Sequence, residues 1–194
     1  GTLFVGPNEG DMACGEFGMG RMSEPLDIVD AVASFFRDRS RLQGRRALVT
    51  SGPTYEPIDP VRYIANRSSG KQGHAIAEAL NGLGTETTLV TGPTRLPDPP
   101  GVNVVHVETA RQMLAACEAT LPADVAVCAA AVADWRVEAE ATEKLKKSPG
   151  VGPPALVMTE NPDILRALSE PGNRRPGLVV GFAAETENVV AHAQ

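Results

Sequence analysis

The sequence predicts an α/β protein with a Rossmann-like, open, mostly parallel sheet and helices on both faces. From Arg45 onwards, short apolar runs alternate with segments of helical periodicity, which is the pattern of β-α-β units. The run DVAVCAA, residues 124–130, is continuously apolar, as expected of a central parallel strand buried on both faces. Hydrophobic residues make up 42% of the chain and aromatic residues only 4%. The core must therefore be built mainly from small aliphatic side chains, which suits helices packed on a sheet.

The elements before the sheet are a Gly-rich and Met-rich stretch without periodicity, up to about residue 25, and one helix. Residues 26–43 place Leu26, Leu42 and the apolar residues between them at roughly helical spacing. Pro25 suits the first turn of this helix and Gly44 its end. We expect the helix to close one domain before the next begins. The chain has no initiator Met, and its last residues read as the opening of a helix, so we expect it to be an excerpt.

The α/β part is expected to contain five strands and three helices. The strands are predicted at residues 45–51, 86–92, 102–107, 124–130 and 177–185. Helices are predicted at about 71–83, at 109–121 with Thr109 as its cap, and in a short segment after Asn161–Pro162.

The connection between the first strand and the next helix is unusually long. It spans about twenty residues within 51–73, whereas such connections usually have ~2–6. Ligands of such sheets bind at the carboxyl ends of the strands. We therefore expect four loops to gather there and form the site: residues 52–70, 91–101, 129–150 and 183–188.

Charge and cysteine content exclude several classes of protein. The net charge is −6 and no basic tail is present, which argues against nucleic-acid binding. The three cysteines lack metal-ligand spacing and indicate free thiols in a reducing compartment. No apolar run reaches the ~18 residues of a membrane span. The sequence thus favours a cytoplasmic enzyme or binding module that does not act at a membrane.

Two common nucleotide motifs are absent after the first strand. A dinucleotide-binding turn needs G-x-G-x-x-G and an acidic residue at the end of the second strand. Here Pro53 follows Gly52, and Thr91 stands where the acid is needed. A P-loop fails as well, because Ala65 replaces its first glycine and Gln72 its Ser or Thr.

General anion chemistry remains. Ser68, Ser69, Gly70 and Lys71 lead into a helix whose first N–H groups have no internal partners, which suits phosphate or substrate binding. Ordinary helix capping by Ser68 or Ser69 explains the same residues, and the sequence leaves both interpretations open.

Two further stretches bear charge near the predicted site. AAAVADWRV, residues 129–137, carries Asp134, which can bind either a nucleotide hydroxyl or a magnesium ion. EKLKK, residues 143–147, places Lys144 and Lys146 on one face of an extended segment. A lysine cluster is usually only a solvated surface. Beside a triphosphate, however, such charges stabilise the leaving pyrophosphate.

Taken together, the motifs resemble phosphopantothenate–cysteine ligase, usually the second half of a bifunctional coenzyme A biosynthesis protein. The matching stretches are SGPTYEPIDPVRYIANRSSGKQG, LVTGP, AAAVADWR, EKLKK, NPDIL and VGFAAET, in that order. ACGEFGMGRMSEP, residues 13–25, resembles the last motif of the flavin-dependent decarboxylase that forms the first half. The resemblance implies that residues 1–43 are the decarboxylase tail with a linking helix. Residues 44–194 would then be the ligase domain without its C-terminal part.

The resemblance implies a two-step reaction. The carboxylate of 4'-phosphopantothenate attacks the α-phosphate of CTP, with Mg²⁺, giving an acyl-cytidylate and pyrophosphate. The amine of L-cysteine then attacks the acyl carbon, giving phosphopantothenoylcysteine and CMP. The long loop would hold this second substrate beside the nucleotide. The resemblance also implies a homodimer through the ligase domain and, in the full-length protein, a larger homo-oligomer with FMN in the decarboxylase half.

Residue roles follow from the same resemblance. Lys144 matches the lysine of the first step, whereas Asn66, Arg62 and Ala131 match residues of the second. The positions that match CTP-binding residues are Asp134, Lys144, Asn161, Pro162, Asp163, Ile164 and Phe182. Cys14 matches the proton donor of the decarboxylase and should be idle here, and further nucleotide-binding lysines would lie beyond Gln194. Two alternatives stay open: a nucleotide-binding module without catalysis, and a relative of the dehydrogenases.

Overall fold

A parallel five-stranded sheet forms the centre of the protein, whose structure is a computed structural model describing residues 4–11, 17–36, 42–146, 152, 154–172 and 174–184. The strands are β3 (Arg46–Ser51), β6 (Glu86–Thr91), β7 (Asn103–His106), β8 (Val125–Cys128) and β11 (Leu178–Gly181). Their spatial order is β11-β8-β3-β6-β7, and every neighbouring pair is parallel. Renumbered along the chain and read from the β7 edge, this is the 3-2-1-4-5 order of Rossmann sheets. The predicted fold class is confirmed.

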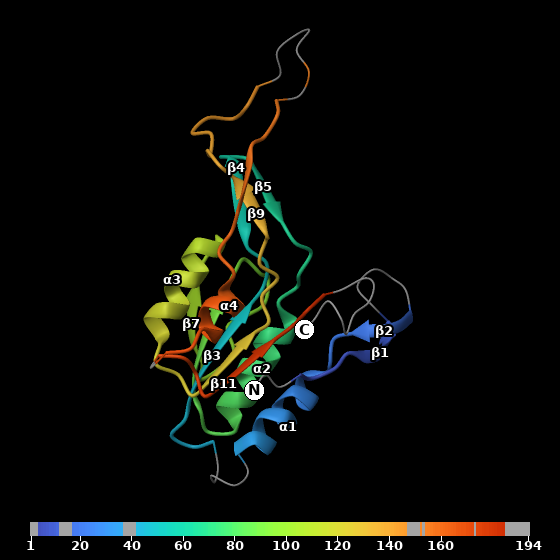
Figure 1. The fold of residues 1–194 in the computed structure, drawn as a ribbon, viewed down its shortest axis with the longest axis vertical. Helices are drawn as coiled ribbons and strands as arrows, with labels where there is room; N and C mark the ends of the chain where they lie inside the picture. Colours follow the sequence, from blue (N-terminus) through green and yellow to red (C-terminus); the bar gives the residue numbers. More distant parts are fainter. Residues whose placement is uncertain are drawn as a thin grey trace.

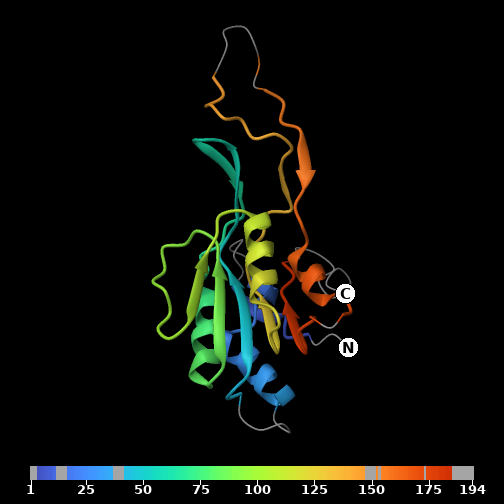
Figure 2. The same cartoon turned by 90° about the vertical axis from the view of Figure 1, so that its left-hand side faces the viewer.

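Helices cover both faces of this sheet (Figures 1 and 2). α1 (Pro25–Phe36) and α2 (Lys71–Gly82) share one hydrophobic cluster with the strands, to which they contribute Ile28, Val32, Ile76, Ala77 and Leu80. α3 (Ala110–Thr120) and α4 (Ile164–Ser169) pack in a second cluster, through Met113, Cys117, Ile164 and Leu168. The two clusters bury the continuously apolar β8 from both sides, as its sequence predicted.

The long connection after β3 is a hairpin and not a plain loop, which corrects the expectation for residues 52–70. β4 (Tyr55–Asp59) pairs antiparallel with β5 (Arg62–Ala65). A second antiparallel pair, β9 (Trp135–Val137) with β10 (Met158–Glu160), lies inside the other long connection. Figure 1 shows both pairs projecting beyond the carboxyl ends of the sheet strands. We call these four strands, with residues 138–146 and 154–157, the arm.

The N-terminal region differs from its prediction at one end of the helix. β1 (Asn8–Asp11) and β2 (Phe17–Arg21) form a hairpin that periodicity did not reveal. α1 begins at Pro25 as expected, but residues 42–44 form a bend and turn instead of continuing the helix to 43. Leu42 is buried in the core, whereas Leu26, the first apolar residue of the helical pattern, is 71% exposed. Leu26 is the second residue of α1 and does not lie on the face that carries Ile28 and Val32 into the core.

The cap of α3 agrees with the sequence. The Thr109 hydroxyl accepts a hydrogen bond from Gln112 N, and the Gln112 side chain accepts one from Thr109 N. This reciprocal arrangement is a capping box.

Replacing Gly92 with alanine is expected to destabilise the protein by ~1–3 kcal/mol, the usual cost of overpacking. An added Cβ would lie 1.7 Å from Pro53 O, so the loops after β3 and β6 would have to separate. Chemical unfolding of both proteins measures the difference. The matched control is Gly82→Ala in α2, where a Cβ meets nothing within 4 Å and helix propensity favours alanine by up to ~1 kcal/mol. Equal stability of the Gly92 variant and the native protein would contradict the close packing of these loops.

Candidate active site

The loops after β3 and β8 meet at the point where the strand order reverses, which is where open α/β sheets bind ligands. Ala131 N donates to Gly52 O (2.8 Å), and Thr54 N donates to Ala131 O (3.4 Å). Pro53 and Ala131 form an isolated parallel bridge. The pairing of the two strands thus continues past the sheet, and Ala131 is held by its backbone.

Asn66 lies beside this segment. Its Nδ2 donates to Val132 O at 2.9 Å, which joins two of the loops that were expected to gather at this edge of the sheet. Within the described ranges, this is the one hydrogen bond of the exposed Asn66 side chain. The second N–H and Oδ1 therefore face solvent and are available to a ligand.

The N-cap of α2 is Gly70, which has no side-chain cap hydrogen bond, so neither Ser68 nor Ser69 is the cap; each serine instead accepts from the N–H group two residues further on. Ser68 Oγ accepts from Gly70 N (3.3 Å), and Ser69 Oγ accepts from Lys71 N (3.4 Å). Gly70 has φ 74°, and a Cβ there would lie 2.6 Å from Thr94 Cγ2, so this position requires glycine. Phosphate binding by these residues stays a prediction. The exposed Lys71 side chain and the helix N-terminus are compatible with it.

Ser51 and His74 hydrogen-bond to this turn, and no sequence motif indicated either residue. Ser51 Oγ donates to Gly70 O (2.8 Å), and His74 Nδ1 lies 3.0 Å from both of these oxygens. Burial lowers the pKa of His74, although its contact with Gly70 O opposes the shift. A neutral, buried imidazole here ties the first turn of α2 to the end of β3.

Asp134 and Asn161, two of the predicted nucleotide-binding residues, come together. Asn161 N donates to Asp134 O (2.8 Å), and Asn161 Nδ2 donates to Ala133 O (2.8 Å). Arg136 donates to Asn161 Oδ1 at 3.3 Å and also to Glu160 O. The Asn161 amide is thereby fixed in one orientation, whereas the Asp134 side chain is exposed.

The remaining nucleotide-binding positions lie around α4 and at the end of β11. Asp163 caps α4, because its Oδ1 accepts from Arg166 N at 2.9 Å. Ile164 is buried in the core, and Pro162 precedes the cap. Phe182 follows β11 and packs against the first core cluster.

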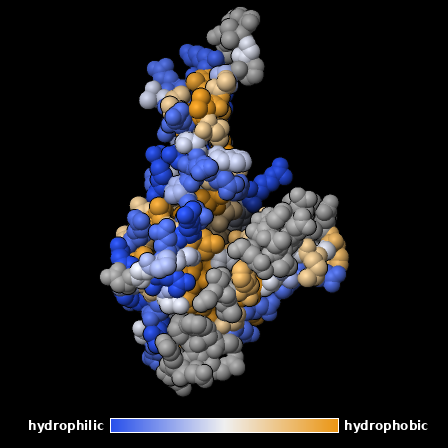
Figure 3. All heavy atoms as spheres, viewed as in Figure 1, coloured by the Kyte–Doolittle hydropathy of each residue, from blue (hydrophilic) through white to orange (hydrophobic). Residues whose placement is uncertain are grey.

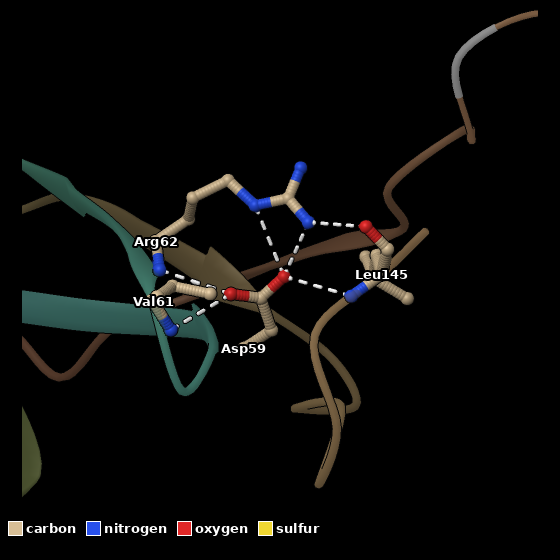
Figure 4. Close-up of polar contacts among 4 residues, drawn as sticks. All are labelled: Asp59, Val61, Arg62 and Leu145. Carbon is tan, nitrogen blue, oxygen red and sulfur yellow. Dashed lines mark hydrogen bonds and ion pairs between the residues drawn. The ribbon is translucent and has the colours of Figure 1, made fainter. Parts of the chain in front are cut away.

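Arg62 has different partners from Asn66 and Ala131. Its guanidinium donates to Asp59 Oδ2 through Nε (3.0 Å) and Nη2 (2.5 Å), and Nη2 also donates to Leu145 O (2.8 Å) (Figure 4). No hydrogen bond joins Arg62 to Asn66 or Ala131. Instead, Arg62 contacts the segment that carries Lys144, whose side chain is exposed.

Neither described cysteine is suited to nucleophilic chemistry. Burial raises the pKa of Cys117 and of Cys128 to about 12, and only the thiolate is an effective nucleophile. Cys117 is buried on α3, and Cys128 ends β8 half-buried. Cys14 lies outside the described residues. Within the described ranges, no three His, Cys, Asp or Glu side chains gather to hold a metal ion, and no helix is long and apolar enough to cross a membrane.

The chain is similar along its whole length to bifunctional proteins of coenzyme A biosynthesis. Over 196 residues, the chain is 46% identical to the coenzyme A biosynthesis bifunctional protein CoaBC of Escherichia coli (strain K12), covering 100% of this chain and 48% of that protein. CoaBC of Haemophilus influenzae is 45% identical over 195 residues, with the same coverage. The chain thus spans about half the length of the curated relatives it matches.

The crystal structure of the C-terminal domain of a CoaBC protein superposes with a TM-score of 0.65 at 42% identity, covering 78% of this chain and 70% of that one. Residues 42–194 match the family model described as "DNA/pantothenate metabolism flavoprotein C-terminal domain". The chain belongs to this family.

Proposed function

We propose that the protein ligates 4'-phosphopantothenate with L-cysteine at the expense of CTP, through an acyl-cytidylate, in coenzyme A biosynthesis. The observation that carries the proposal is the meeting of Asn66 with the 131–134 segment at the switch point, because both stretches match ligase motifs. The names of the relatives, which place them in coenzyme A biosynthesis, support it.

The first step needs charge stabilisation at the phosphates. The phosphopantothenate carboxylate attacks the α-phosphorus, the α–β bridging bond breaks, and pyrophosphate takes the electron pair. Lys144 would offset the charge that develops on the leaving group. Mg²⁺ is usually held by one or two carboxylates and by substrate phosphates, and the exposed carboxylate of Asp134 suits that role or a contact with the ribose.

The base would be recognised by the 161–164 segment. Because Ala133 and Arg136 already engage the Asn161 amide, we assign recognition of the cytosine edge mainly to backbone groups of this segment. The Asn161 side chain would keep those groups in place.

The second step takes place beside Asn66. The cysteine amine attacks the acyl carbon, an oxyanion develops on the carbonyl oxygen, and CMP leaves. The free N–H of Asn66 can donate to that oxyanion without becoming charged itself. Ala131, whose backbone is bridged to Pro53, would lie beside the same group.

The arm supports a dimer of this domain. Large apolar or aromatic side chains are exposed on the arm and at the β4–β5 turn, among them Val61 (59%), Tyr63 (52%), Trp135 (58%) and Val157 (65%). Figure 3 shows hydrophobic side chains gathered along the arm. Large exposed apolar patches commonly mark interaction sites, and we propose that a second copy covers the arm.

The segment before the α/β domain would belong to a second activity. We propose that residues 1–43 are the end of an FMN-dependent decarboxylase domain and that residues 44–194 are the ligase domain. The full-length protein would form a larger homo-oligomer through its decarboxylase half.

Pyrophosphate release by the full-length protein tests the proposal. With phosphopantothenate, cysteine and Mg²⁺ present, we expect release with CTP and much slower release with ATP. Equal rates with both nucleotides would contradict the assigned specificity. Binding of CTP without turnover would favour the non-catalytic module, and preferential binding of NAD would favour the dehydrogenase relative.

A further inference from the structure

Asp59, at the turn of the β4–β5 hairpin, is a buried carboxylate that accepts an unusually large set of hydrogen bonds. Oδ1 accepts from Val61 N and Arg62 N, both at 2.9 Å. Oδ2 accepts from Arg62 Nε and Nη2 and from Leu145 N at 3.1 Å. The Asp59 side chain has no exposed surface, whereas that of Arg62 is 48% exposed.

The two oxygens of Asp59 have separate functions. Contacts of Oδ1 with the next two N–H groups of the turn are an ordinary local motif of aspartate. Oδ2 is not needed for the turn. It holds a residue 86 positions further along the chain, and Arg62 closes the loop by donating to the carbonyl of that same residue. Both backbone groups of Leu145 are therefore held by one ion pair (Figure 4).

This ion pair anchors the lysine-bearing segment. Ala141 N donates to Ile58 O at 3.0 Å, so residues 141–145 are attached to β4 at two points. Leu145 is half-buried, while the side chains before and after it, Lys144 and Lys146, are exposed. The lysines thus project from a backbone that is fixed beside them.

We propose that Asp59 is a positioning residue, which through Arg62 and Leu145 fixes the place of Lys144 relative to the nucleotide phosphates. The inference rests on the proposed function for the role of Lys144. It also changes the role expected for Arg62. The resemblance assigned Arg62 to the second step, whereas its contacts with Asp59 and Leu145 would make it support the first. The remaining guanidinium nitrogen of Arg62, Nη1, points away from both Asp59 and Leu145 (Figure 4).

The pKa of Asp59 agrees with an ionised carboxylate at every physiological pH. Burial alone would raise this pKa, but hydrogen bonds from Arg62, Val61 N and Leu145 N lower it to about 2. The ion pair is therefore permanent under assay conditions and does not act as a pH switch.

Asp59→Asn tests the proposal, because asparagine keeps one oxygen for the turn but replaces the other with an NH₂ group that cannot accept from Leu145 N. We expect the rate of pyrophosphate release to fall on the order of 10²-fold, the usual cost of misplacing a catalytic group by about 1 Å. The reaction of supplied acyl-cytidylate with cysteine should stay within a few-fold of normal. In a protein that already carries Lys144→Gln, adding Asp59→Asn should not lower the rate of pyrophosphate release any further.

The matched control is Asp124→Asn. Asp124 also binds an arginine, Arg45 at 2.8 Å, and a backbone N–H, Arg46 N at 2.8 Å, but it precedes β8 at the opposite end of the sheet. This variant is expected to lose stability while keeping both rates. The proposal would be overturned if Asp59→Asn released pyrophosphate at the native rate. It would also be overturned if Asp59→Asn slowed release as much in the Lys144→Gln background as in the native protein.

Amide hydrogen exchange provides a readout that does not depend on catalysis. The peptide covering residues 141–146 should exchange faster in Asp59→Asn than in the native protein, and at the native rate in Asp124→Asn. If the native protein released no pyrophosphate with any nucleotide, the proposed ligase function would fail, and the exchange rates would still decide whether Asp59 anchors the segment. Unchanged exchange in Asp59→Asn would refute the anchor itself.

Discussion

Lys144→Gln is expected to slow CTP-dependent pyrophosphate release on the order of 10²–10³-fold, the usual cost of removing one preorganised electrostatic group from a transition state. The Lys144 side chain is exposed and the backbone beside it is held through Leu145, so the substitution should leave the fold intact. Single-turnover measurement with phosphopantothenate and CTP gives the rate directly.

The control for this variant is Lys146→Gln, which removes the same charge two residues further along the exposed segment. If the position of the charge matters more than the total charge, Lys146→Gln should slow pyrophosphate release much less than Lys144→Gln. Near-normal pyrophosphate release by Lys144→Gln would instead assign this lysine to the solvated surface.

In Asn66→Asp, phosphopantothenate should still be activated, but the acyl-cytidylate should accumulate, with the cysteine-dependent step slowed on the order of 10²-fold. The substitution is nearly isosteric but exchanges two N–H donors for an acceptor. In the native protein, Asn66 Nδ2 donates to Val132 O at 2.9 Å. The new carboxylate would face that carbonyl oxygen and would repel a developing oxyanion. The intermediate can be trapped by quenching and identified by mass.

Asn81→Asp is the control for the loss of an amide-to-carbonyl contact. Asn81 Nδ2 donates to Pro100 O at 3.4 Å near the end of α2. Both half-reactions should proceed normally in this variant. If Asn66→Asp consumed the intermediate at the native rate once cysteine was added, the assigned role would be wrong. A parallel loss of both steps together with thermal stability would indicate that Asn66 only stabilises its turn.

The sheet and its helices could be predicted because their signals are local. The apolar run of β8, the Thr109 cap of α3 and the strand-helix alternation each depend on neighbouring residues. The same locality explains the error at residues 52–70. Tyr55–Asp59 contains Pro57 and acidic residues, which is a poor strand by propensity. Stacking of Tyr55 on Tyr63, with ring centroids 4.0 Å apart, and the distant Leu145 stabilise the hairpin.

The contacts around the candidate site could be predicted only in part, and the roles of its residues stay predictions. Sequence motifs indicated Asn66, Ala131, Asp134 and Asn161, and the fold brings these into two contacting pairs of segments. Besides the nearby Asp59, Arg62 binds Leu145, which lies 83 residues away and is bound through its backbone carbonyl, so no side-chain pattern could reveal this contact.

The most direct test of the ligase proposal is a single turnover of the full-length protein with phosphopantothenate, CTP and Mg²⁺ but no cysteine. The two-step mechanism predicts one pyrophosphate per occupied site and an acyl-cytidylate of matching amount, which disappears as CMP and phosphopantothenoylcysteine form when cysteine is added. Pyrophosphate release without any acyl-cytidylate, or release that begins only when cysteine is present, would contradict it.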